Sequence, residues 1–121
     1  MKKSRGPSDY KLYLQEIVFH IQIIEEYLKG LTLEQFINDR KTIDAVDANL
    51  RNVGEVMNVL SKIPKIKAEF YCHHIPWQDI ASLRHNLSHE YFGRDPEIVW
   101  RNATSLLPRI KLQIIKILSE V

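Results

Sequence analysis

The chain has 121 residues, of which 45% are hydrophobic and 26% are charged, and its formal net charge at pH 7 is +2. This composition excludes a disordered chain, and the small net charge excludes nucleic-acid binding through a global field, so any RNA site must be a local cluster. The single cysteine, Cys72, excludes an internal disulfide, and we expect neither a signal peptide nor a membrane span. We therefore expect one cytoplasmic domain over residues 1–121, with residues 1–8 flexible.

Apolar residues at helical spacing predict two long helices in the first half of the chain. The first covers about residues 9–29, and its apolar stripe consists of Leu14, Ile17, Val18, Ile21, Ile24 and Leu28. Gly30 suits the left-handed residue after its end, and Thr32 and Gln35 form a capping box for a short helix that seats Phe36. The second long helix covers about residues 39–62, and it carries a heptad seam typical of helix bundles, formed by Ile43, Val46, Leu50, Val53, Met57 and Leu60.

Proline and glycine divide the next part of the chain. We expect Pro64 to end the second long helix, because proline removes a backbone donor inside a helix. Residues 64–75 are then predicted to form a connection rather than part of the core. A further helix should start near Pro76 and end at Gly93, with its apolar side formed by Ile80, Leu83 and Leu87.

The last segment has a strong helix start. Asp95 is a capping acceptor, and Pro96 stands at the first helical position. Pro108 lies inside this segment and should kink or divide it. No strand pattern competes with these helices, so the sequence predicts an all-α fold, an up-and-down bundle of four to five main helices.

The helix expected after Pro76 carries a dense set of polar groups in the run Arg84-His85-Asn86-Leu87-Ser88-His89-Glu90-Tyr91. RNA brings its own nucleophile, the 2′-hydroxyl, so a ribonuclease without metal needs two groups from the protein. One moves protons near neutral pH, and the other holds the charge that develops on the phosphoryl oxygens. His89 and Arg84 are those two groups. Two copies of the run facing each other across a two-fold axis would make a fuller site.

This run, which reads R-x4-H-x-Y, continues through Phe92-Gly93 and Ile98-Val99-Trp100. The whole stretch resembles the HepT-like toxins of the HEPN superfamily, the ribonuclease half of a type VII toxin–antitoxin pair, and the resemblance extends from about Asp9 to the C-terminus. It implies an HEPN-like bundle, a homodimer, and cleavage of RNA without metal by Arg84 and His89.

The resemblance also implies a partner and a means of control. The partner is the cognate antitoxin, an MNT-type nucleotidyltransferase that attaches AMP to Tyr91. AMP would place phosphate charge and bulk beside the site and repel RNA. The supporting polar shell is formed by His85, Asn86 and Ser88, and His85 stands where the family usually has Asn. That departure keeps a second function open, a non-catalytic helical companion subunit of the nucleotidyltransferase.

Several polar and aromatic residues have alternative roles. His85 and His89 lie four residues apart and could hold a metal ion with a third ligand, but we expect no metal and no other cofactor. His73 and His74, the candidates for that third ligand, are predicted to be solvent-facing loop residues. Trp77 and Trp100 are expected to anchor the core or an interface. Three arginines could line a path for RNA or belong to a solvated helical face, namely Arg94, Arg101 and Arg109.

Overall fold

The computed structural model describes residues 10–81, 83 and 95–120. In chain order, these residues form α1 (Tyr10–Leu28), α2 (Leu33–Ile37), α3 (Arg40–Leu60), α4 (Pro64–Cys72), α5 (Trp77–Ala81), α6 (Pro96–Arg101), the π-helix η3 (Asn102–Leu106) and α7 (Leu107–Glu120). No strand occurs within these ranges, so the predicted all-α class is confirmed. Residues 1–8, which were expected to be flexible, lie outside the described part.

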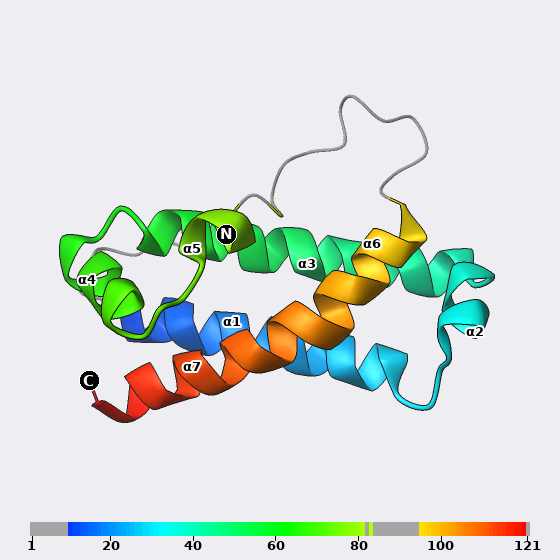
Figure 1. Ribbon diagram of the computed structural model, residues 1–121, viewed down its shortest axis with the longest axis horizontal. Coiled ribbons are helices and arrows are strands. Elements are labelled where there is room, and N and C mark those ends of the chain that lie inside the picture. Colours follow the sequence, from blue (N-terminus) through cyan, green and yellow to red (C-terminus); the bar gives the residue numbers. More distant parts are fainter. Residues whose placement is uncertain (1–9, 82, 84–94, 121) are drawn as a thin grey trace, which may run out of the picture.

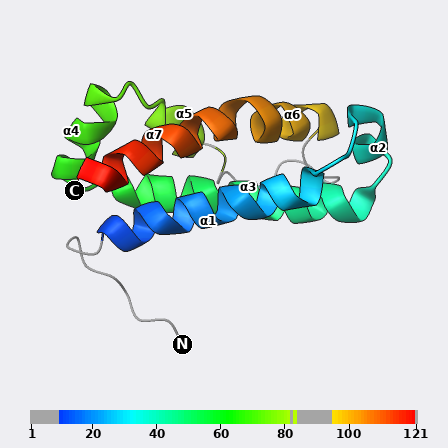
Figure 2. The ribbon, with the colours of Figure 1, turned by 90° about the horizontal axis from the view of Figure 1, so that it is seen from below.

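The longest elements of the described part are α1, α3 and the rod formed by α6, η3 and α7, and Figure 1 shows them packed together. Helices α1 and α3 run antiparallel to each other. The continuous α6–η3–α7 rod packs against α1 and also runs antiparallel to it. Figure 2 shows the short helices at the two ends, with α2 at one end and α4 at the other. The bundle is therefore confirmed, and α5 lies beside α3 at the point from which the chain continues toward the motif.

The core consists of one apolar face from each rod. The heptad seam of α3 is almost completely buried, as predicted. It meets the buried residues of α1, which are Leu14, Ile17, Ile21 and Ile24, and those of α7, which are Leu107, Ile110, Ile114 and Ile117. Burying each such side chain contributes about 1.5–3 kcal/mol to folding, so packing between the rods fixes their relative positions.

Local signals set the helix ends as the sequence indicated. Gly30 has φ +79°, the left-handed conformation that lets the chain turn after α1 without a Cβ clash. The hydroxyl of Thr32 accepts a bond from the Gln35 N–H at 3.2 Å, and the Gln35 side chain accepts one from the Thr32 N–H at 2.9 Å. Asp95 caps α6 by accepting a bond from the Glu97 N–H at 2.9 Å. The predicted capping box and helix starts are confirmed.

The prediction that residues 64–75 form a mere connection is wrong. Helix α3 ends at Leu60, and Pro64 begins α4 instead of ending the helix before it. Proline fits there because the first N–H groups of a helix have no partner within the helix. Ile66 and Phe70, one turn apart, are fully buried at the end of the bundle. Two apolar residues suffice to seat a short helix, but they are too few to show a period in the sequence.

The division expected at Pro108 is confirmed and takes the form of a π-helix. Proline has no N–H to donate to the carbonyl of Thr104, so the regular bonding pattern fails at this point. The N–H of Leu107 instead bonds to the carbonyl of Asn102, five residues back, and η3 joins α6 to α7.

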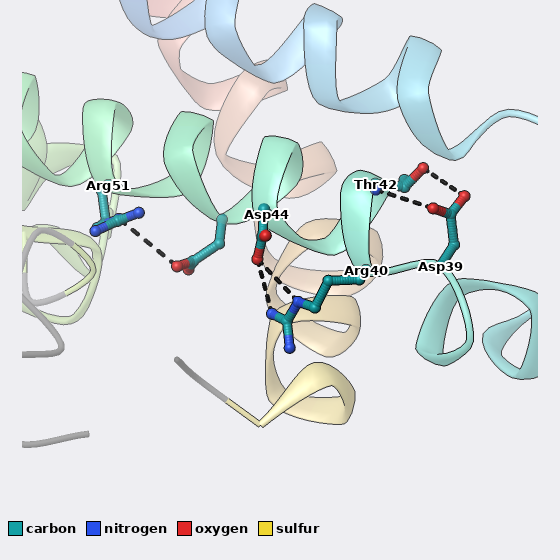
Figure 3. A network of polar contacts seen from close by, with 6 residues as sticks. Asp39, Arg40, Thr42, Asp44 and Arg51 are labelled. Carbon is teal, nitrogen blue, oxygen red and sulfur yellow. Dashed lines mark hydrogen bonds and ion pairs between the residues drawn. The ribbon is translucent and has the colours of Figure 1, made fainter. Parts of the chain in front are cut away.

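The start of α3 depends on one carboxylate, shown in Figure 3. Asp39 accepts bonds from the Thr42 hydroxyl at 2.6 Å and from the Thr42 N–H at 3.1 Å. The hydroxyl bond, followed by the backbone bond, lowers the pKa of Asp39 from its ordinary value of 3.8. Because the folded pKa is below the unfolded one, the stabilisation is complete above pH 3.8 and is lost as the pH falls through the folded pKa.

We therefore expect Asp39→Ala to lower the melting temperature at pH 7, through loss of the helix cap and its charge. The difference from the wild type should shrink as the pH falls below 3.8, where the wild-type carboxyl becomes protonated. Thermal unfolding followed by circular dichroism from pH 7 to pH 2.5 measures both effects. Glu55→Ala is the control, because Glu55 is an exposed carboxylate farther along the same helix. An Asp39 effect that does not change with pH would contradict this account.

Candidate active site

The structure places the flanks of the motif rather than the motif itself. The residues predicted for the site and its polar shell lie outside the described residues, namely Arg84, His85, Asn86, Ser88, His89 and Tyr91. On the N-terminal side, Ile80 and Leu83 belong to the buried core. On the C-terminal side, Asp95 caps α6 and Val99 is fully buried. Both ends of the segment are therefore tied to the same core.

A groove of about 430 Å³ lies between these flanks. One wall is Asp79 of α5, and the other belongs to the α6–η3–α7 rod, with Arg101, Asn102, Ser105, Leu106 and Arg109. Arginine presents a planar set of donors that matches the geometry of a phosphate group. The amide of Asn102 and the hydroxyl of Ser105 add uncharged hydrogen-bonding groups. This wall is chemically suited to an anionic ligand with sugar hydroxyls.

Arg101 and Arg109 are exposed, and neither is in an ion pair with a carboxylate of the described residues. The arginines of α3 differ in this respect. Arg40 Nη2 lies 2.7 Å from Asp44 Oδ1, and the Arg51 side chain also pairs with a carboxylate of its own helix (Figure 3). The two groove arginines are thus the ones whose charge is not neutralised by a neighbouring acid of the rod. Arg94, the third arginine that the sequence offered for a path along the RNA, lies outside the described residues.

The groove is built on the irregular part of the rod. Asn102, Ser105 and Leu106 all belong to η3, and Arg101 and Arg109 lie directly before it and three residues after it. A π-helix is less stable than an α-helix and occurs often at functional sites. Here Pro108 accounts for the irregular hydrogen bonding of the rod, and the groove lies on the irregular segment.

The two tryptophans hold the flanks in place, as predicted. Trp100 of α6 packs on Phe36 of α2, with ring centroids 5.3 Å apart and ring planes at 47°. Trp77 opens α5 and packs against the core, and the Nζ of Lys67 lies 5.2 Å from its ring centroid. Both rings are partly buried, so their packing rather than base stacking explains them.

No helix in the described ranges is both long and apolar enough to cross a membrane.

The chain matches a known protein family in sequence. The model of the family "Ribonuclease HepT-like" matches residues 17–117. The chain belongs to this family. The matched range contains α3, α5 and the groove, and it includes the complete R-x4-H-x-Y run. The resemblance inferred from the sequence is therefore confirmed.

Individual relatives of this HepT-like chain include archaeal proteins. The chain is 34% identical over 113 residues to a gamma-glutamylcyclotransferase and candidate RNase of Methanocaldococcus jannaschii, covering 93% of the chain but only 49%, about half, of that relative. A candidate RNase of the same organism is 35% identical over 113 residues, with 93% and 90% covered. The probable ribonuclease HepT of Thermococcus cleftensis is 33% identical over 103 residues, with 84% and 89% covered. No solved structure matches the chain.

One buried charge of this HepT-like chain was not predicted from its sequence. Asp47 is only 6% exposed, and it is the charged residue that the core of the described part encloses. Its Oδ2 lies 3.6 Å from Arg51 Nε. Asp47 follows the seam residue Val46 directly, and a charge beside a heptad seam is the signal that could have identified it.

One prediction about the histidines of the HepT-like chain is wrong. His73 is not a solvent-facing loop residue, because its side chain is only 15% exposed and its Nε2 lies 3.0 Å from Glu120 Oε1. His74 is exposed, as expected. The spacing of Glu69 and His73, four residues apart, would have placed both on one side of a helix had α4 been predicted.

Proposed function

We propose that the chain is a metal-independent endoribonuclease and the toxin component of a type VII toxin–antitoxin system in the cytoplasm. One observation carries the proposal. The family match over residues 17–117 contains, at positions 84–91, a run with the two groups that RNA transesterification requires. The groove between α5 and the α6–η3–α7 rod supports it, because exposed arginines line the surface between the two flanks of that run.

In the proposed reaction, the 2′-hydroxyl of the substrate attacks the adjacent phosphorus. His89 accepts the 2′ proton, and Arg84 holds the negative charge that grows on the phosphoryl oxygens. The bond between phosphorus and the 5′ oxygen breaks, and that oxygen takes up a proton. The products are a 2′,3′-cyclic phosphate and a 5′-hydroxyl end, so the reaction consumes no water in its first step.

One imidazole cannot easily serve the attacking and the leaving oxygen at once, because they lie on opposite sides of the phosphorus. We therefore propose a homodimer in which two copies of Arg84 and His89 face each other across the two-fold axis. The second copy would supply the group that protonates the leaving oxygen. Cross-linking that places the two motifs on opposite outer faces of the dimer would contradict this arrangement.

The groove is proposed to guide the RNA backbone on either side of the cleaved bond. Replacing Arg101 and Arg109 together by alanine should weaken RNA binding by about 10-fold or more, because two phosphate contacts are lost. The salt dependence of binding should also become less steep, by about 0.7 per contact on a log–log plot. Fluorescence anisotropy with a labelled single-stranded RNA at several salt concentrations measures both quantities.

The control for charge is Lys29→Ala with Lys41→Ala, which removes two exposed cations that do not line the groove. An equal loss of affinity in this variant would show that the groove arginines act only through net charge. Asp79→Asn removes the acidic wall of the groove and should strengthen binding modestly.

Silencing is proposed to occur at Tyr91. A nucleotidyltransferase of the MNT type would transfer AMP to the phenol oxygen and place a phosphodiester charge near Arg84. The modified chain would then hold its own phosphate where the substrate phosphate should bind.

The test of the proposed function is cleavage of single-stranded RNA by the purified chain in the presence of EDTA. The products should carry 2′,3′-cyclic phosphate ends or their opened form. Activity that disappears with chelation and returns with Zn²⁺ or Mn²⁺ would contradict the mechanism. A chain that cleaves no RNA yet binds the nucleotidyltransferase tightly would instead be the companion subunit, the alternative that His85, in place of the usual Asn, keeps open.

A further inference from the structure

Helix α4 and the end of α7 lie at the same end of the bundle (Figures 1 and 2). They bring together a compact group of metal-ligating side chains. It consists of Glu69 and His73 of the α4 segment and Glu120 of α7. The Nε2 of His73 lies 3.0 Å from Glu120 Oε1 and 3.8 Å from Glu69 Oε2. One ligand atom from each residue lies within 4.8 Å of the other two. The residues of the ribonuclease proposal take no part in this group.

The way in which α4 ends fixes the position of His73. The N–H of Ile75 bonds to the carbonyl of Phe70 at 2.9 Å, and His74 between them has φ 56°. This is the Schellman arrangement, in which a left-handed residue reverses the chain and a hydrophobic pair closes the turn. Phe70 and Ile75 are that pair, and both are buried. His73 therefore lies directly after Cys72, the last residue of α4, and about one turn after Glu69, on a backbone held by the core.

Helix α7 contacts the same point through two side chains. The amide of Gln113 donates a bond to the carbonyl of His73 at 2.9 Å, and Glu120 reaches the imidazole of the same residue. Residues from two separate helices are thus brought to one imidazole. The His73 ring is mostly enclosed, with 15% of its side chain exposed, whereas the carboxylates of Glu69 and Glu120 remain open to solvent at 33% and 48%. A small cation could enter from the carboxylate side.

The electrostatic setting favours a cation. Two carboxylates supply formal negative charge, and both α4 and α7 direct their C-terminal ends toward the group. The C-terminus of a helix carries a partial negative charge from its unpaired carbonyl groups. A neutral imidazole has one N–H group and can donate it with good geometry to only one acceptor. Hydrogen bonding to His73 therefore does not by itself explain why two carboxylates lie beside this nitrogen.

We propose that Glu69, His73 and Glu120 bind a divalent transition-metal ion of the zinc class, with water completing its coordination. Zinc accepts one imidazole nitrogen and carboxylate oxygens at about 2.0–2.2 Å, which places ligand atoms roughly 3.3 Å apart in a tetrahedral site. The separations of 3.0 and 3.8 Å from the imidazole bracket that value, and the two carboxylate oxygens lie within 4.8 Å of each other, so closure of the site requires the carboxylates to approach each other. The imidazole ligand disfavours Mg²⁺, which prefers oxygen atoms alone.

The ion would join the end of α7 to α4 and would contribute to stability rather than to cleavage. This inference does not rest on the proposed ribonuclease function, and either could fail without the other. A metal bound only by the folded chain raises the melting temperature in proportion to the logarithm of its concentration.

The test is titration of the EDTA-treated and dialysed chain with ZnCl₂, followed by calorimetry and by thermal unfolding. We expect about one Zn²⁺ per chain and a rise in melting temperature of about 5 °C when free Zn²⁺ is about ten times the dissociation constant. His73→Gln and Glu120→Gln should each abolish the high-affinity uptake and the rise in melting temperature. Glu120→Gln alters an exposed side chain, so it tests the site even if His73→Gln disturbs the packing of α4.

Matched controls separate this site from other histidines and acids. His74→Asn keeps a residue that tolerates the left-handed conformation, and Glu34→Gln removes an exposed acid of α2. Both should bind Zn²⁺ as the wild type does. The double variant His85→Gln/His89→Gln should also retain the ion. No uptake by the wild type, uptake that persists in His73→Gln or Glu120→Gln, or loss only in the double variant would overturn the proposal.

Discussion

Alanine at His89 or at Arg84 is expected to lower the rate of RNA cleavage by about 100-fold or more. General acid–base catalysis by one positioned side chain contributes about 10²–10⁴-fold, and removal of one group that stabilises developing charge costs about 10²–10³-fold. Because the two groups act on the same transition state, the double variant should be only slightly slower than either single one. In bacteria, the wild-type chain expressed alone should arrest growth, and the variants should not.

The measurement is the initial rate of cleavage of a labelled single-stranded RNA in EDTA, at equal concentrations of folded protein. His74→Asn and Arg40→Ala are the controls, since they remove an exposed histidine and an exposed arginine distant from the motif in sequence. Mixing the Arg84→Ala and His89→Ala chains tests the composite site. A mixed dimer keeps one arginine and one histidine on different copies, so a partial return of activity is expected if the site spans both. A fully active His89→Ala chain would remove the basis of the mechanism.

The second large effect is expected at Tyr91. The substitution Tyr91→Phe keeps the ring and its packing but removes the oxygen that would accept AMP. The variant should therefore remain folded, cleave RNA, and stay toxic when the nucleotidyltransferase is co-expressed. Growth rescue by the partner should be almost complete for the wild type and absent for the variant, because a neutral ring places no phosphate charge near Arg84.

Mass spectrometry of the co-expressed wild type should find AMP on the peptide that contains Tyr91. Tyr27→Phe is a matched control, because Tyr27 is an exposed tyrosine on α1, and its variant should be silenced normally. An unmodified Tyr91 in a fully silenced complex would show that the partner works by covering the site. In that case, silencing would require only the stoichiometric complex.

Most of the fold could be predicted because long periodic segments dominate it. The stripe of α1 repeats over about four turns and the seam of α3 over about five, so chance spacing cannot easily imitate them. The starts of α2, α3 and α6 depend on single capping residues, which the sequence displays directly. Helix α4 was missed because Pro64 can either end a helix or begin one, and only the burial of Ile66 and Phe70 decides between the two.

The site was predictable in part. The resemblance based on the R-x4-H-x-Y run identified the family. The residues of that run lie outside the described part of the chain. The groove was weakly indicated, since Arg101 and Arg109 fitted an ordinary solvated face equally well. Their common surface depends on the π-helix, and the presence of a proline does not by itself specify that conformation. The pairing of His73 with Glu120 joins residues 47 positions apart, which no local pattern reveals.

The π-helix also sets the rotational phase of the rod. Residues eight positions apart in a regular α-helix point about 80° away from each other. A π-helix has about 4.4 residues per turn, so each residue advances the chain by about 82° instead of about 100°, and a five-residue segment lags by roughly 90°. That lag brings Arg101 and Arg109 to nearly the same side. A regular α-helix through the same residues would leave both arginines in the chain but separate them by about 80°, close to a quarter turn. The groove therefore depends on the conformation of this segment as much as on the identity of its residues.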